Sequence, residues 1–400
     1  MQKYSFKKIV GKIHLWLGLA SGLVVFIVSL TGCIYVFQEE ISRALNTNVW
    51  VEVEPQNQPY ASVETYINKV KEQYTGELNR ITFDIFYSQN DAVVSWVEDL
   101  DDNNKAFILN PYTGEVIKSF EYSVTFWAFV RSMHVSLLIP GIGDDIVAAS
   151  TLIFLISLIS GLVLWWPRNK KVAKKRVSFK WQKRTGMKRK NYDLHNILGF
   201  YSIFALIFIT VSGLTMAYDW MDQAVMWTVN GGSVNNQEEI TEPTLSESLQ
   251  NKQQEEYSLG VDETLKSIRE SYNGFKHFFI IFPESTDTVY VMAEPTEDSF
   301  YNRTDIYKLE RSSGRIAGYE LWESKNNGEI YQGMELDIHV GSVLGLPGKI
   351  LAFVVSLIAA TLPITGFYIW WGRRPKKSKR KPVKKNQRSR KPNKVAASVS

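Results

Sequence analysis

The sequence predicts an α-helical membrane protein: a four-helix transmembrane bundle built from a two-fold internal repeat, with two extracytoplasmic α+β modules. Three observations support this fold class. Four apolar stretches are each long enough to cross a bilayer core of about 30 Å. Two long acid-rich segments separate these stretches. Finally, the two halves of the chain align with each other around matched histidines.

The four apolar stretches define the membrane part of the chain. They run from about Ile13 to Phe37, Ile146 to Trp166, Leu194 to Tyr218 and Ile350 to Trp371. We expect the first to be retained, because its apolar run is too long for a signal peptide and Glu39–Glu40 follow it instead of small residues. Cys33 is the one cysteine, which excludes an intramolecular disulfide, a cysteine-ligated iron–sulfur cluster and a four-cysteine zinc site.

The charges are separated along the chain, although the net charge is only +5. Basic residues dominate the N-terminal arm, the loop 168–190 and the tail from Arg373, whereas the segments 40–125 and 219–335 are acid-rich. The positive-inside rule therefore places both termini in the cytoplasm and both long segments outside. We interpret the basic segments as anchors to anionic lipid and not as nucleic-acid-binding surfaces.

Each long segment is expected to fold as one helix on a small antiparallel sheet. In the first segment, a helix-like stretch (61–74) is followed by three strand-like runs (80–87, 92–98 and 106–109) and a turn with Gly114. In the second, a helix-like stretch (261–272) is followed by three strand-like runs (275–282, 288–293 and 305–310) and a turn with Gly314. The predicted domains are the N-terminal arm and first span (1–40), module 1 (41–125), an outer interfacial helix and second span (126–167), a basic cytoplasmic loop (168–192), the third span (193–218), module 2 (219–328), an outer interfacial helix and fourth span (329–372), and a basic cytoplasmic tail (373–400) expected to be disordered.

Four of the five histidines occupy matched positions in the repeat. HLWLGLASGLVVFIVSLTG, from His14, aligns with HNILGFYSIFALIFITVSG, from His195, and His134 aligns with His339 in the same way. The fifth, His277, lies in a strand-like run without a matched histidine.

The positions of the matched histidines predict two levels in the membrane. His14 and His195 begin the first and third spans, so we expect them near the cytoplasmic face. The other two lie in short apolar stretches, separated from the following spans by breaks at Pro140–Gly141 and Pro347–Gly348. We expect this second pair near the outer face.

Ionisable side chains within a membrane are expensive and usually functional. Zinc requires four ligands, or three and a water, and no cysteine or carboxylate recurs beside the inner pair. A proton relay usually alternates acids with histidines, and the four apolar stretches contain no acid. Two histidines on facing helices suit haem, which takes one axial imidazole from each side. We therefore predict two bis-histidine haems, one held by His14 and His195 and the other by His134 and His339.

Three charged residues lie near the second pair in the sequence. Arg131, three residues before His134, is within reach of a haem propionate, and an ordinary interfacial arginine would explain it equally well. Glu335 and Asp337 precede His339 in MELDIH. Acids in such positions contribute to a small metal site less often than they orient the imidazole or face water.

Several of these stretches resemble the PepSY-associated transmembrane helix family: KIHLWLGL, LISGLVLWWPR, HVGSVLGLPG and LPITGFYIWWGRR. NPYTGEVI and the strands before it resemble a PepSY module, and RSSGRIAG is a weaker version of the same motif. The resemblance covers nearly the whole chain apart from the basic tail. It implies a bacterial inner-membrane reductase that carries haem b on His14, His134, His195 and His339. Its implied reaction is the reduction of ferric siderophores in the periplasm, which releases ferrous iron.

Electrons would have to come from a separate donor, because GxGxxG and GxxxxGK[ST] are absent and the cytoplasmic segments are too short for a flavin domain. A soluble flavin reductase and the quinol pool are the two candidates. Two other functions remain open. A membrane-anchored protein that binds peptides or regulates proteases would leave the membrane histidines unexplained, and a small transporter would have unusually few spans, none of them interrupted.

Overall fold

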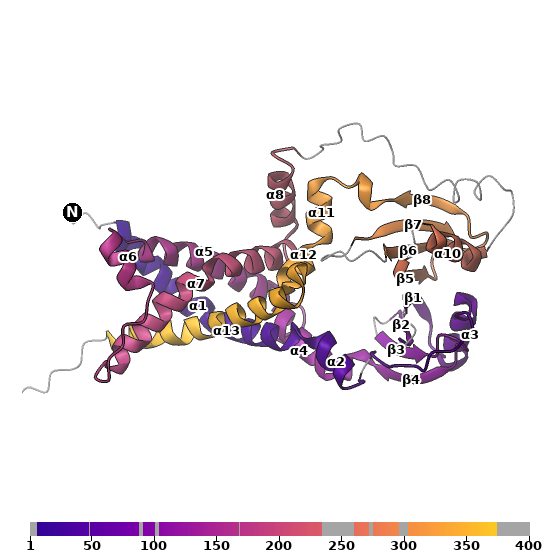
Figure 1. Ribbon diagram of the computed structural model, residues 1–400, viewed down its shortest axis with the longest axis horizontal. Coiled ribbons are helices and arrows are strands. Elements are labelled where there is room, and N and C mark those ends of the chain that lie inside the picture. The colour runs from indigo at the N-terminus through magenta and orange to yellow at the C-terminus, as the bar shows by residue number, and fades with distance from the viewer. Residues whose placement is uncertain are drawn as a thin grey trace, which may run out of the picture.

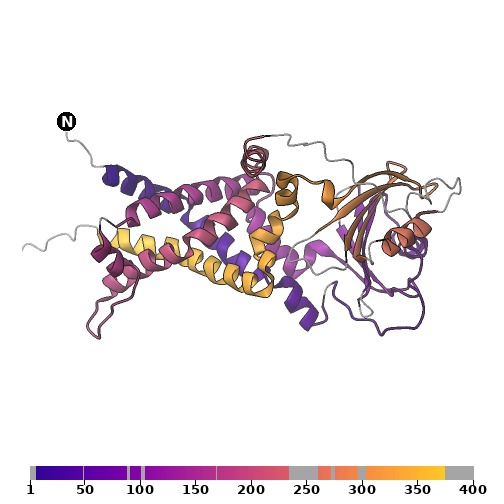
Figure 2. The ribbon, with the colours of Figure 1, turned by 45° about the horizontal axis from the view of Figure 1, so that its top comes forward.

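The computed structural model describes residues 6–47, 49–87, 91–100, 104–167, 169–233, 260–271, 275–295 and 303–373. The predicted basic tail lies outside the described residues, apart from Arg373. Figures 1 and 2 show two bodies side by side along the longest axis, one made of long helices and the other of a β-sheet with its own helices.

Four helices form the helical body: α1 (Phe6–Tyr35), α5 (Gly143–Trp165), α7 (Met187–Thr215) and α13 (Gly345–Gly372). They are long and apolar enough to cross a membrane, which confirms the four predicted spans. Helices α1 and α7 each pack against both α5 and α13, so the four helices form a closed ring. Helix α1 starts seven residues before the predicted apolar run, because the basic arm continues it.

Short helices connect the two bodies and the ends of the long helices. They are α2 (Gln38–Ala44), α4 (Phe126–Ser136), α6 (Lys170–Arg176), α8 (Asp219–Val229), α11 (Asn327–Gly333) and α12 (Glu335–Val340), with single 3₁₀ turns at Tyr122–Val124, Trp322–Ser324 and Ser342–Leu344. Helix α6 lies at the end of the long helices away from the sheet, and α4 and α12 lie at the end near it (Figure 1).

One of the two predicted breaks was misplaced. Helix α4 does end before Pro140, at Leu137 and Leu138, which both have positive φ. Pro347 and Gly348, however, lie inside the first turn of α13, where a proline removes no hydrogen bond that the helix needs. The chain turns earlier, at Gly341 (φ 81°), where a Cβ would lie 2.4 Å from the carbonyl oxygen of Gly348.

The second body contains one eight-stranded antiparallel sheet in the order β4-β3-β2-β1-β5-β6-β7-β8. The strands are β1 (Leu78–Phe86), β2 (Val93–Asp99), β3 (Asn104–Leu109), β4 (Val116–Glu121), β5 (Phe275–Pro283), β6 (Thr288–Pro295), β7 (Asp305–Glu310) and β8 (Ile316–Glu320). We expected two separate small sheets, and this was wrong: β1 pairs with β5. Pairing satisfies the backbone groups of two edge strands that would otherwise be exposed.

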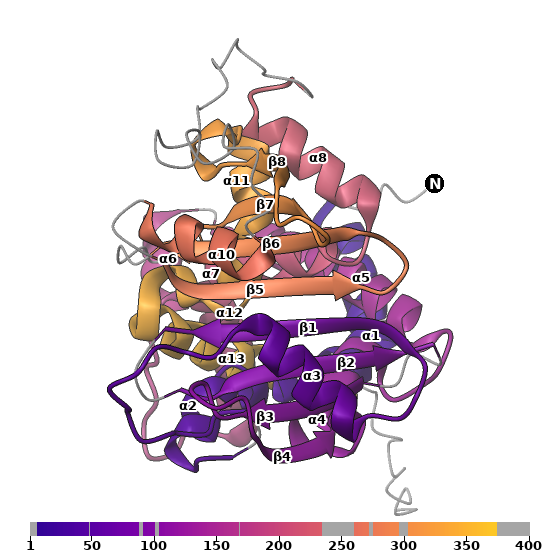
Figure 3. The ribbon, with the colours of Figure 1, turned by 90° about the vertical axis from the view of Figure 1, so that its right-hand side faces the viewer.

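Helices α3 (Val63–Gln73) and α10 (Gly260–Glu270) cover one face of this sheet, the face turned away from the long helices (Figures 1 and 3). Their apolar side chains form a single core with alternate residues of the strands, such as Ile81, Phe83 and Ile85 of β1. Because side chains alternate along a strand, Thr82 and Asp84 lie on the opposite face, toward the long helices.

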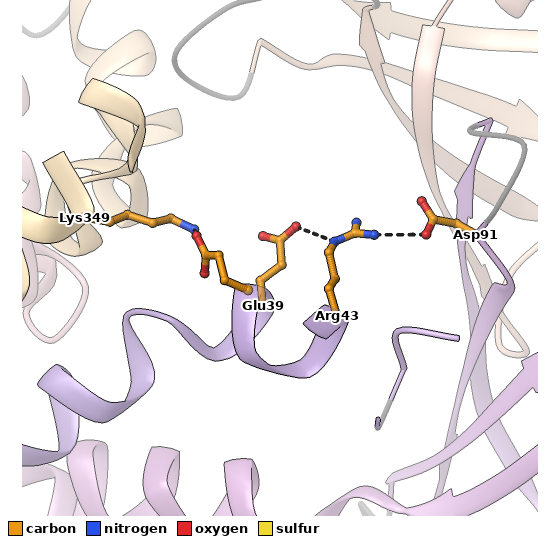
Figure 4. Close-up of polar contacts among 5 residues, drawn as sticks. Glu39, Arg43, Asp91 and Lys349 are labelled. Carbon is orange, nitrogen blue, oxygen red and sulfur yellow. Dashed lines mark hydrogen bonds and ion pairs between the residues drawn. The ribbon is translucent and has the colours of Figure 1, made fainter. Parts of the chain in front are cut away.

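A chain of ion pairs connects the two bodies (Figure 4). Lys349, near the start of α13, lies 2.6 Å from Glu40 of α2. In the same short helix, Arg43 pairs with Glu39 at 3.1 Å and with Asp91, beside β2, at 3.0 Å. These contacts join the start of α13 to α2, and α2 to the sheet beside β2.

Candidate functional site

The four matched histidines meet as two pairs within the helical body. His14 of α1 and His195 of α7 have ring centroids 6.3 Å apart and ring planes at 75°. His134 of α4 and His339 of α12 have centroids 6.0 Å apart and planes at 74°. We call the first pair sheet-distal and the second sheet-proximal. The structure thus brings together the residues that the sequence matched.

In the sheet-distal pair, each ring is held by a neighbouring helix of its own half of the chain. His14 Nδ1 lies 3.1 Å from the Ser157 carbonyl oxygen and 3.0 Å from Ser160 Oγ, both on α5. His195 Nδ1 lies 2.9 Å from Thr365 Oγ1 of α13 and also bonds the backbone of Leu362. Both rings are therefore fixed through Nδ1.

The sheet-proximal pair repeats this arrangement on α1 and α7. His134 Nδ1 lies 2.9 Å from the Val28 carbonyl oxygen and 3.2 Å from Thr31 Oγ1. His339 Nδ1 lies 3.0 Å from the Ile209 carbonyl oxygen and 3.2 Å from Ser212 Oγ. In all four cases the carbonyl belongs to the residue three positions before the hydroxyl residue.

These contacts determine which ring nitrogen carries the proton. A carbonyl oxygen can only accept, so Nδ1 must donate. The hydroxyl groups donate within their own helices, for example from Ser160 Oγ to the Ser157 carbonyl oxygen, and so they too accept from the ring. Nε2 is then an unprotonated acceptor, and it has no hydrogen-bond partner among the described residues. Histidines that bind metals are typically oriented in this way, with the second ring nitrogen donating to a carbonyl.

A glycine follows each hydroxyl residue and lets the ring approach the helix. A Cβ would lie 3.2 Å from His14 Cε1 at Gly161, 3.4 Å from His195 Cε1 at Gly366, 3.1 Å from His134 Cε1 at Gly32, and 3.0 Å from His339 Cε1 at Gly213. We call the carbonyl, the hydroxyl and the following glycine a histidine cradle. The cradles were not predicted, although a Ser-Gly or Thr-Gly step occurs in each of the four spans.

A cavity of about 500 Å³ adjoins the sheet-distal pair, within the range of about 300–1,000 Å³ usual for small-molecule and cofactor sites. Both histidines line it, together with Gly18, Gly22 and Gly199, whose lack of side chains leaves room beside the rings.

Other polar groups line the same cavity. Lys7 and Arg373 supply positive charge. The Trp165 ring stacks on Phe200 at 3.7 Å, and its buried Nε1 has no partner among the described residues. The cavity thus combines apolar walls with two cationic side chains and one unpaired indole N–H.

The three charged residues near the sheet-proximal pair, Arg131, Glu335 and Asp337, each have a different environment. Arg131 is exposed and lines a second cavity, between the helical body and the sheet. Glu335 shares a hydrogen bond with Asp222, and burial together with that neighbour raises the pKa of Glu335. Asp337 accepts from Ser342 Oγ at 2.6 Å. Among the described residues, no three His, Cys, Asp or Glu side chains gather as metal ligands.

His277 has a structural position in the sheet, away from both pairs. It lies on β5 with Nε2 3.1 Å from Asp84 and Nδ1 3.5 Å from Glu294, and its ring stacks on Phe86 at 4.3 Å. Burial lowers the pKa of His277, but the hydrogen bonds to the two carboxylates outweigh this and raise it to about 9. The charged ring links β1, β5 and β6 at the joint of the sheet.

Four long apolar helices, two pairs of cradled histidines and an antiparallel sheet at one end define a multi-pass membrane protein with a polar site in its helical body. More specifically, the chain belongs to the family described as the PepSY-associated TM region, which it matches over residues 12–373. This confirms the family indicated by the sequence motifs. No curated protein is significantly similar to the chain.

Proposed function

We propose that this protein is a haem b electron-transfer protein of the bacterial inner membrane, which passes electrons from the cytoplasmic side to a ferric siderophore in the periplasm. The main support is the arrangement of the two histidine pairs. Each of the four rings is fixed through Nδ1 by a cradle, and each keeps Nε2 for a ligand.

The spacing of the rings fits two imidazoles bound to one iron. An imidazole nitrogen binds a metal at about 2 Å, so two rings on opposite sides of one ion have centroids about 6 Å apart. The observed distances are 6.3 Å and 6.0 Å. With no third ligand side chain nearby among the described residues, this donor set suits haem, whose remaining ligands come from the macrocycle, and does not suit zinc.

On this proposal, His14 and His195 hold one haem, His134 and His339 hold the other, and haem supplies reversible one-electron chemistry. The cradles orient the four imidazoles and, through the Nδ1 hydrogen bonds, make Nε2 a stronger donor. The cavity at the sheet-distal pair provides the apolar surroundings, and Lys7 and Arg373 provide charges suited to propionate groups. The protein's contribution is thus to fix the ligands, the spacing and the exclusion of water.

We also infer that the chain is a two-fold repeat with one PepSY-like module in each half. Each half contributes one histidine to each pair and holds both of its histidines in its own cradles. Each also follows the order of one helix and four strands, α3 with β1–β4 and α10 with β5–β8.

The basic segments favour cytoplasmic termini and a periplasmic sheet. The donor would be a soluble flavin reductase or quinol. Neither a peptide-binding nor a transport function gives the cradles a role.

The test is single-turnover oxidation of the reduced protein. The purified protein is reduced with dithionite, freed of excess reductant and mixed without oxygen with a ferric siderophore, while haem absorbance and a ferrous-iron chelator are followed together. We expect haem oxidation and ferrous iron to appear with the same rate constant. The gallium(III) form of the siderophore is the control and should leave the haem reduced. A reduced protein that is not oxidised by any ferric siderophore would contradict the proposed reaction.

A further inference from the structure

A second cavity, of about 630 Å³, lies between the sheet and the sheet-proximal end of the helical body. Its floor is formed by α2, α4 and the 3₁₀ turn before α4, and its roof by strands β1 to β5. Arg131 on the floor is three residues before His134, so one turn of α4 separates the cavity from the sheet-proximal pair. The cavity is the right size for a small-molecule ligand.

Aromatic rings make up much of the cavity wall. Trp96 and Tyr122 meet edge to face with ring centroids 5.4 Å apart, and Trp127, Phe120 and Phe279 line the same space. A hydrogen bond of 2.9 Å from Trp96 Nε1 to Asp84 fixes the indole. The rings come from both bodies of the molecule, so a ligand held between them would contact the sheet and α4 together. Such walls favour a ligand with aromatic rings.

The charge of the cavity is positive, because its two arginines are not equally neutralised. Arg80 forms an ion pair of 2.6 Å with Glu98. Arg131 has no ion-pair partner among the described residues. An unpaired guanidinium at the floor of an aromatic cavity selects for negative charge in the ligand.

The second half of the chain does not repeat this site. The positions that align with Arg131 and Trp127 hold Leu336 and Gln332, and Gln332 is bonded to Asp222 at 3.1 Å. The aligned positions of the second half therefore carry neither the guanidinium nor the indole.

We propose that this cavity is the acceptor site, an inference that rests on the proposed function. The cavity takes ferric chelates with aromatic arms and net negative charge, the tris-catecholate class. In the reaction, one electron passes to the chelated ferric ion, which becomes ferrous. The electron would come from a haem held by His134 and His339, which would change from the ferrous to the ferric state. No bond to carbon or oxygen is made or broken in the electron transfer itself, and the chelate then releases the ferrous ion.

Binding can be separated from reduction with gallium(III), which has the charge of the ferric ion and is not reduced. Calorimetry of the purified holoprotein would compare two gallium complexes, one of a hexadentate tris-catecholate ligand and one of an uncharged hexadentate tris-hydroxamate. We expect the tris-catecholate to bind at least tenfold more tightly. Arg131→Gln should weaken its binding by tenfold or more, and Ile281→Trp, which fills the cavity from β5, should abolish it. Leu336→Gln, at the aligned position, is the matched control and should bind as the wild type does.

The outcomes separate the acceptor site from the proposed function. Equal binding of the two complexes, or wild-type binding by both Arg131→Gln and Ile281→Trp, would overturn the assignment of the cavity. The visible spectrum of each sample is recorded alongside. A wild-type protein without haem bands would overturn the electron-transfer function, whatever its affinity for the gallium complexes.

Discussion

The cradle glycines provide a direct way to displace a histidine ligand without removing it. Replacing Gly213 by alanine puts a methyl group 3.0 Å from His339 Cε1, whereas non-bonded carbon atoms prefer about 3.5–4.0 Å. The ring must therefore move by roughly 0.5 Å or more. That movement strains the Nδ1 contacts to the Ile209 carbonyl oxygen (3.0 Å) and to Ser212 Oγ (3.2 Å).

We expect Gly213→Ala to weaken haem binding at the sheet-proximal pair about 10–100-fold, as is typical when the groups that orient a metal ligand are altered. This corresponds to about 1.4–2.7 kcal/mol of binding free energy. The fold should survive, because alanine in a helix interior is favoured over glycine by about 0.5–1 kcal/mol. Haem titration of the apoprotein, followed by absorbance, measures the change.

Gly186→Ala is the matched control: it adds the same methyl group at the N-terminus of the same helix, α7, with nothing within 4 Å. It should bind haem as the wild type does. If Gly213→Ala bound haem at both pairs with unchanged affinity and spectrum, the cradle would not position His339, and the argument from the glycines would fail.

Three further predictions concern other parts of the structure. Gly161→Ala, which puts a methyl group 3.2 Å from His14 Cε1, should weaken haem binding at the sheet-distal pair and leave the sheet-proximal spectrum unchanged. Because the folded pKa of His277 is raised to about 9, its ion pairs should stabilise the sheet fully below about pH 6.5 and lose this effect as the pH rises through 9. Thermal unfolding of the wild type should show this loss of stability. An equal loss in His277→Gln would exclude His277 as its cause. Tyr66→Phe, which removes a buried hydrogen bond of 2.6 Å to the Pro111 carbonyl oxygen, should lower the free energy of unfolding by about 1–3 kcal/mol, and a change within error would contradict this.

The parts of the fold that depend on local pattern could be predicted from the sequence. Apolar runs predicted the four spans, and alternation predicted the helix and the first three strands of both long segments. The fourth strand of each segment, β4 and β8, was not predicted. The pairing of β1 with β5 could not be predicted, because edge strands almost 200 residues apart in sequence carry no local signal for each other. The turn at Gly341 was missed because Pro347 looks like a break, although proline fits the first turn of a helix.

The functional site could be predicted only in part, for a similar reason. Alignment of the two halves was enough to select the four histidines and to assign them to two levels. It could not show that Ser160–Gly161 holds His14, because that contact depends on how α1 and α5 pack. The cavity at Arg131 could not be predicted from the sequence either, because its wall comes from both bodies. Contacts between elements, unlike the elements themselves, depend on tertiary packing.

The central claim, that the two histidine pairs hold two haems, is tested most directly by haem content and the visible spectrum before and after dithionite. We predict b-type bands and two haems per chain in the wild type, about half of that absorbance in His14→Ala and in His339→Ala, and no loss in His277→Ala. A colourless wild-type protein, purified folded from membranes with haem supplied during expression, would contradict the account.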